Sequence, residues 1–154
     1  MRRRQSVFFW LLWVIVGLAP YSFLVGQGVD HTDPVKVANF VLNAIYYKDA
    51  PSVVLAMDPE QKKLYEPLTV YKRQELERSL EKDKEKIGDT KEVSELRACT
   101  TLSGKPGIAA QIRKKGDELY VIILLQEGEL YYYDTILTLL PKAYKDLKLI
   151  QKVK

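Results

Sequence analysis

Residues 116–137, GDELYVIILLQEGELYYYDTIL, contain two strand patterns joined by a short turn. The first pattern, LYVIILLQ, is apolar at consecutive positions, which is typical of a strand that is covered on both faces of a sheet. The turn signals KKGD and EG lie before and after it, and the tyrosine-rich pattern ELYYYDTILTLL follows. This stretch therefore predicts an antiparallel hairpin whose first strand is central in its sheet.

Two further strand patterns precede the hairpin. Residues 91–103, KEVSELRACTTLS, alternate between two faces, and residues 108–114, IAAQIRK, place both isoleucines on one face. The intervening GKPG turns the chain. Together the four patterns predict a four-stranded antiparallel meander that ends at Pro141. The lysine-rich residues 141–154 are expected to form a basic C-terminal tail.

Helix start signals dominate the part of the chain before the strands. An Asp-Pro pair occurs at residues 33–34 and again at 58–59, where aspartate caps a helix and proline fits its first position. Gly88 suits the end of a long charged helix. The predicted helices cover residues 34–47, 51–57, 59–66 and 69–87. With the meander they give an α+β fold class for a domain spanning residues 33–140.

Charge separates the first 28 residues from the rest of the chain. The 154 residues include 24 Lys+Arg and 20 Asp+Glu, and the first 28 residues hold three of the arginines and no acid. The remaining chain is nearly neutral, whereas a nucleic-acid-binding domain carries its basic excess on the folded part. We therefore expect no nucleic-acid partner.

The chain has one cysteine, Cys99, and one histidine, His31. A single cysteine forms no internal disulfide, and its position excludes a lipoprotein signal, which needs a cysteine directly after the apolar segment. His31 lies in the joint before the first helix and is expected to be solvated. The sequence has no metal-binding cluster, phosphate-binding glycine loop or nucleophile motif, so we expect no cofactor, no metal and no catalytic set.

Residues 7–25, VFFWLLWVIVGLAPYSFLV, form an uncharged run of 19 residues behind the three arginines. That length spans a hydrocarbon core of about 30 Å, and the arginines keep the N-terminus in the cytoplasm. Trp10, Trp13 and Tyr21 are aromatics of the kind enriched at membrane interfaces. Residues 1–28 are therefore predicted to be a single-pass anchor in the cell membrane, with the following domain exported. Cleavage of a signal peptide near Gly28 is the alternative, and it would give a secreted protein.

Residues 33–57, DPVKVANFVLNAIYYKDAPSVVLAM, and the hairpin stretch quoted above resemble the nuclear-transport-factor-2-like superfamily of cone-shaped α+β proteins. The similarity is greatest to small exported bacterial members without an assigned function. It covers residues 33 to about 139 and implies helices packed on a curved four-stranded antiparallel meander, often around a pocket. It does not imply one activity, because this scaffold serves isomerases, dehydratases and binding modules.

Asp134 is the main candidate for chemistry inside the predicted cone. On strict alternation it shares a face with Leu130, Tyr132 and Ile136, where burial would raise the pKa of its carboxyl and make it a candidate acid or base. We expect a structural role for it and no catalysis. The alternatives are an outward position or a partnered carboxylate near a bulge. Tyrosine hydroxyls could complete a pocket, although tyrosine is also an ordinary packing residue. The pocket candidates are Asp134, Tyr132, Tyr46 and Tyr65.

These patterns favour a membrane-anchored, extracytoplasmic and non-catalytic binding domain. Its expected partners are the membrane, envelope proteins or a small apolar ligand. An assembly subunit of a cell-envelope or secretion complex is the first alternative. A small-molecule isomerase or dehydratase that uses Asp134 with a tyrosine is the second.

Overall fold

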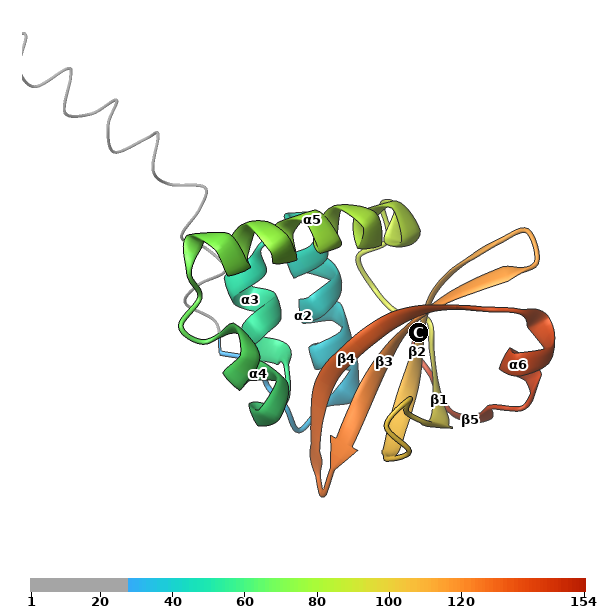
Figure 1. Ribbon diagram of the computed structural model, residues 1–154. Helices are drawn as coiled ribbons and strands as arrows, with labels where there is room; N and C mark the ends of the chain where they lie inside the picture. Colours follow the sequence, from blue (N-terminus) through green and yellow to red (C-terminus); the bar gives the residue numbers. More distant parts are fainter. Residues whose placement is uncertain (1–27) are drawn as a thin grey trace, which may run out of the picture.

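The computed structural model describes residues 28–154, and the predicted anchor residues Trp10, Trp13 and Tyr21 lie outside this range. Within it the chain is α+β, with five helices and one five-stranded antiparallel sheet (Figure 1). No helix in residues 28–154 is long and apolar enough to cross a membrane. The elements are α2 (Pro34–Tyr46), α3 (Ala50–Ala56), α4 (Pro59–Tyr65), α5 (Val70–Ile87), β1 (Glu95–Thr100), β2 (Pro106–Lys115), β3 (Glu118–Glu127), β4 (Leu130–Leu139), α6 (Pro141–Lys145) and β5 (Lys148–Lys152).

The first three helices begin at aspartate caps. The carboxylate of Asp33 accepts hydrogen bonds from the backbone N–H groups of Val35 and Lys36 at the start of α2. Asp49 and Asp58 cap α3 and α4 in the same way. Each cap is followed by a proline in the first turn, so local sequence fixes where these helices start.

The sheet has the strand order β4-β3-β2-β1-β5. Strands β1 to β4 form the predicted antiparallel meander, and β3 lies inside it. Alternate residues of β3 are buried on opposite faces: Ile122 and Leu124 join one hydrophobic cluster, and Val121 and Ile123 join another. The prediction that this strand is covered on both faces is therefore confirmed.

Helices α2, α3 and α5 lie together on one face of the curved sheet (Figure 1). Their buried side chains, among them Leu42, Val53 and Leu80, form the main core with the facing residues of the strands. The opposite face is covered by the segment between β4 and β5. There Tyr144 and Leu147 pack against the second cluster, so the two faces of the sheet carry two separate cores.

Residues 141–154 correct the sequence analysis, because they form no tail. The chain leaves β4, crosses the second face through α6 and returns as β5, which pairs antiparallel with β1. Lys152 lies opposite Glu95 in this register. The physical reason is that β1 offers an unpaired edge and the second face offers apolar surface, which Tyr144 and Leu147 cover. The sheet consequently has five strands where four were expected.

Candidate functional site

Asp134 lies at a bulge in β4. The pairing of β3 with β4 shifts register between Ile123 and Leu124, which leaves Asp134 without a partner residue in the ladder. The extra residue reverses the alternation, and Tyr133 and Ile136 are therefore both buried in the main core. The strict alternation assumed for this strand is therefore corrected: β4 contains a bulge at Asp134.

The Asp134 carboxylate is half-buried and is engaged by a neighbouring helix. Its Oδ1 accepts a hydrogen bond of 2.9 Å from the side-chain amide Nε2 of Gln61 in α4. This geometry matches the alternative of a partnered carboxylate near a bulge. The hydrogen bond links α4 to β4, and its two residues are 73 positions apart in the sequence. The contact therefore contributes to the fold.

Tyr132 contacts the joint before α2. Its ring centroid lies 4.6 Å from that of His31. The Nδ1–H of His31 donates to the carbonyl oxygen of Tyr131 at 2.7 Å, and the N–H of Tyr131 donates to the carbonyl oxygen of His31 at 2.8 Å. His31 is thus half-buried rather than solvated, and these contacts hold the joint against the edge of β4.

The other two candidate tyrosines lie at the ends of helices. Tyr46, at the end of α2, has the ammonium groups of Lys84 and Lys91 at 4.6 Å and 4.8 Å from its ring centroid, which is a cation–π arrangement. Tyr65, at the end of α4, packs against the main core. Within residues 28–154 no hydrogen bond joins either tyrosine to Asp134. Tyr65 lies one helical turn after Gln61 on α4. It and Asp134 both lie close enough to Tyr133 to add to the effect of burial, which raises the pKa of that side chain. That the four candidates form one pocket stays a prediction.

Two groups with acidic protons, the half-buried Cys99 and the buried Tyr133, are held in their protonated forms. Burial, with a smaller contribution from the charge of Asp134, raises the pKa of the Cys99 thiol to about 11. Burial also raises the pKa of Tyr133 far above its usual range. A thiol with such a pKa is largely un-ionised at neutral pH, so Cys99 is a packing residue rather than a nucleophile.

A polar cluster attaches α6 to β1 on the second face. The hydroxyl of Tyr144 donates to Glu95 Oε2 at 2.7 Å, and Arg97 Nη2 lies 3.2 Å from the same oxygen. The guanidinium carbon of Arg97 lies 4.3 Å from the ring centroid of Tyr144, and its Nη1 donates to the carbonyl oxygen of Leu147. The hydrogen bonds from Tyr144 and Arg97 hold the pKa of Glu95 below its usual range. These contacts fasten the segment that leads into β5.

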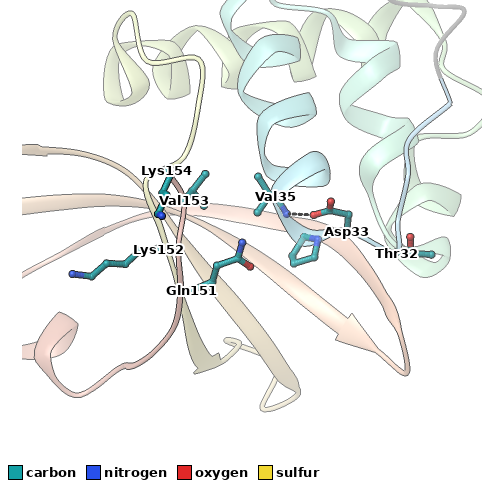
Figure 2. A pocket seen from close by; sticks show the side chains of 8 residues that line it. Thr32, Asp33, Val35, Gln151, Lys152, Val153 and Lys154 are labelled. Carbon is teal, nitrogen blue, oxygen red and sulfur yellow. Dashed lines mark hydrogen bonds between the residues drawn. The ribbon is translucent and has the colours of Figure 1, made fainter.

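A groove of about 690 Å³ lies between the first turn of α2 and the end of the sheet formed by β5 (Figure 2). Figure 2 shows Gln151 extending toward the first turn of α2, whereas Lys152 extends to the other side of the strand. The carboxylate of Asp33 is occupied by its capping bonds. The groove is lined by Thr32, Asp33, Pro34, Val35, Gln151, Lys152, Val153 and Lys154.

The sequence analysis missed this groove because one of its walls is β5, which was not expected. The alternation of Leu147 and Leu149 was the one available signal for a strand, and it is masked by five lysines in residues 141–154. Within residues 28–154 no group of three His, Cys, Asp or Glu side chains is arranged to hold a metal ion. The groove and the neighbouring edge of β5 are therefore the candidate functional site, and this site is suited to binding.

The sequence matches no family model, and neither a curated protein nor a solved structure matches it. The resemblance to the nuclear-transport-factor-2-like superfamily stays a prediction.

Proposed function

We propose that this protein is a membrane-anchored, extracytoplasmic domain that binds a partner protein and performs no catalysis. The observation that carries the proposal is β5, an edge strand whose five residues are all exposed and which borders the groove. Unpaired backbone N–H and C=O groups along such an edge are ready to pair with another chain.

The order of charge and apolarity in residues 1–28 supports the location. Three arginines precede 19 uncharged residues, and the domain follows directly. This order is typical of an anchor whose N-terminus stays in the cytoplasm. An N-terminal anchor places the partner site outside the cytoplasm and near the membrane.

The contacts of Asp134 support a non-catalytic role. A general base must be within hydrogen-bond reach of its substrate, but the Asp134 carboxylate is engaged by Gln61 and is positioned by a bulge. The candidate Tyr46 makes its contacts with Lys84 and Lys91 instead. The same helices-then-meander order also supports the proposed cone-shaped fold, with β5 as an addition to it.

An assembly subunit of a cell-envelope complex is the second candidate. The open edge of β5 favours it as well, since a neighbouring subunit can continue the sheet there. The two candidates differ in whether the partner is bound transiently or permanently.

Fractionation and protease accessibility of the full chain in its native membrane test the proposal. We expect the protein in the membrane fraction, with residues 29–154 cleaved by protease added from the outer side only. Cleavage from the cytoplasmic side would overturn the proposal. N-terminal sequencing adds a finer result: a soluble exported form that starts at Val29 would remove the anchor and leave export intact.

A further inference from the structure

The two sides of β5 differ completely. One side pairs with β1 from Glu95 to Ala98, and the other side has no neighbouring strand within residues 28–154. Two apolar side chains at its centre, Leu149 and Ile150, are 38% and 54% exposed. An exposed edge with apolar side chains is a template for an added strand unless its charge prevents this.

The positive charge of the exported domain is concentrated in residues 141–154, which contain β5 and α6. Residues 29–154 contain 21 basic and 20 acidic side chains. Five lysines and one aspartate lie in residues 141–154, which leaves 16 basic and 19 acidic side chains in residues 29–140. The domain is thus slightly acidic except for the segment that contains β5.

The lysines of this segment are available to a partner. Among residues 28–154 none of the five lysines forms an ion pair. Lys152 acts on Glu95 at longer range, but that carboxylate is already bonded to Tyr144 and Arg97. Lys148 and Lys152 stand at the two ends of β5, and both are exposed.

A second copy of this chain is a poor occupant of the edge. Antiparallel pairing of two copies brings the Lys148 end of one strand beside the Lys152 end of the other. Like charges on paired strands are destabilising, and edge lysines are a common device against self-pairing. Acidic side chains on an added strand would instead be attracted to the lysines of β5.

The groove adds an apolar surface next to the edge. Pro34, Val35 and Val153 contribute carbon surface to it, and the amide of Gln151 adds a donor and an acceptor. In an added strand successive side chains point to opposite faces, so one set lies on the α2 side, over the groove. The pairing of β5 with β1 shifts register at Ile150. Lys148 therefore lies opposite Ala98 on the α2 side, and Lys152 lies opposite Glu95 on the other side. A complementary strand would therefore carry acidic residues on both faces and apolar residues over the groove.

We propose that β5 and the adjoining groove bind an extended, acidic segment of a partner protein, which adds to the sheet as a sixth strand. This inference rests on the proposed function, because it names the partner of that binding site. Main-chain hydrogen bonds supply the pairing, and the lysines select for acidic sequences.

The test measures peptide binding to the full chain in zwitterionic detergent micelles. The probe is a fluorescently labelled peptide of valine and glutamate whose glutamates lie on both faces of the added strand, one to reach Lys148 and one to reach Lys152. There are two control peptides. In the first, lysine replaces each glutamate; the second keeps the glutamates and has prolines at other positions, so its charge is unchanged. Fluorescence anisotropy gives the Kd, and hydrogen exchange with mass spectrometry follows the amides of residues 148–152.

We expect saturable binding of the acidic peptide, with slowed exchange in residues 148–152. The double variant Lys148→Glu with Lys152→Glu should weaken that binding about tenfold or more, because each lost charge contact contributes on the order of a factor of a few to ten. The matched control, Lys82→Glu with Lys115→Glu, reverses two exposed lysines elsewhere and should change the Kd less than twofold.

Several outcomes would overturn the inference. Equal binding of the proline-containing peptide would mean attraction without strand pairing. Binding to vesicles with anionic lipid in place of the acidic peptide would make the edge a membrane contact, and dimerisation with slowed exchange at β5 would make it a self-association surface. No binding at all would leave the lysines as protection against self-pairing. None of these results alters the location of the domain, which the protease experiment tests separately.

Discussion

The two edges of the sheet are protected in different ways. At β4 the backbone of His31 pairs with Tyr131, Met57 bridges to Tyr133, and a bulge at Asp134 follows. At β5 all residues are exposed, and lysines stand at both ends. One edge is covered by other parts of the chain, while the other is open and has lysines and an irregular pairing at Ile150.

Substitutions at the two edges of the sheet are therefore expected to have different effects. The β4 edge makes its contacts with other parts of the same chain, so substitutions there should change the free energy of unfolding. The β5 edge makes internal contacts only toward β1, so changes on its outer side should act on binding. The following predictions test that difference.

The largest effect is expected at the covered edge, from Tyr133→Ala. The Tyr133 side chain is 5% exposed and lies in the main core, and truncating a buried aromatic side chain costs about 3–5 kcal/mol. Ile150→Ala on β5 is the matched control and should cost less than about 0.5 kcal/mol, because that side chain is largely exposed. Urea unfolding of both variants measures the difference, and similar losses would contradict the comparison.

A smaller effect is expected from the bond between α4 and the bulge. Asp134→Ala and Gln61→Ala should each lower the free energy of unfolding by about 1 kcal/mol, since each removes the 2.9 Å hydrogen bond. The double variant should cost less than the sum of the two, because the same bond is lost only once. Asp134→Asn keeps an acceptor oxygen and should cost less than Asp134→Ala. Additive losses in the double variant would show that the two side chains act independently.

The attachment of β5 should depend on pH through Glu95. Its pKa is lowered in the folded state, so its contribution is present above the ordinary carboxyl pKa and is lost as the pH falls through the lowered value. Tyr144→Phe removes the first cause of that shift and should flatten the stability–pH curve below about pH 4.5. Unfolding of both proteins as a function of pH measures this. An unchanged curve would mean that Arg97 and Lys152 lower the pKa of Glu95 without the help of Tyr144.

The smallest effect on stability is expected at the open edge. Lys148→Thr with Lys152→Thr should change the free energy of unfolding by less than about 0.5 kcal/mol, because both side chains are exposed and form no ion pair within residues 28–154. The same variant should self-associate with increasing concentration, as measured by analytical ultracentrifugation, since β-branched residues without charge favour edge pairing. A variant that stays monomeric at all concentrations would show that the two lysines are not what prevents self-association at the β5 edge.

Local signals in the sequence predicted much of the fold. The Asp33 and Asp58 caps and the turn at residues 127–129 act over a few residues, and the structure has them as expected. The α+β class and the four-stranded meander followed from these signals. The location of the membrane anchor depends on residues outside the described part of the chain and stays a prediction.

The candidate site was not predictable in the same way. The bulge at Asp134 depends on how residues of two strands pair, and a one-residue shift leaves no local signal. Strand β5 reads as a charged tail because its partner β1 lies about 50 residues earlier in the chain. The groove needs both β5 and the start of α2, so it exists only in the folded chain.

The pairing of β5 with β1 also has a consequence for the order in which the domain assembles. Partner residues in this pairing are 50 to 57 positions apart, whereas the hairpins of the meander close over short turns. Short loops close at a lower entropic cost, so the meander forms first and β5 docks last. Until then β1 is itself an open edge without lysine protection. A chain that is interrupted before residue 148 would therefore present the edge of β1, in place of the edge of β5, to its neighbours.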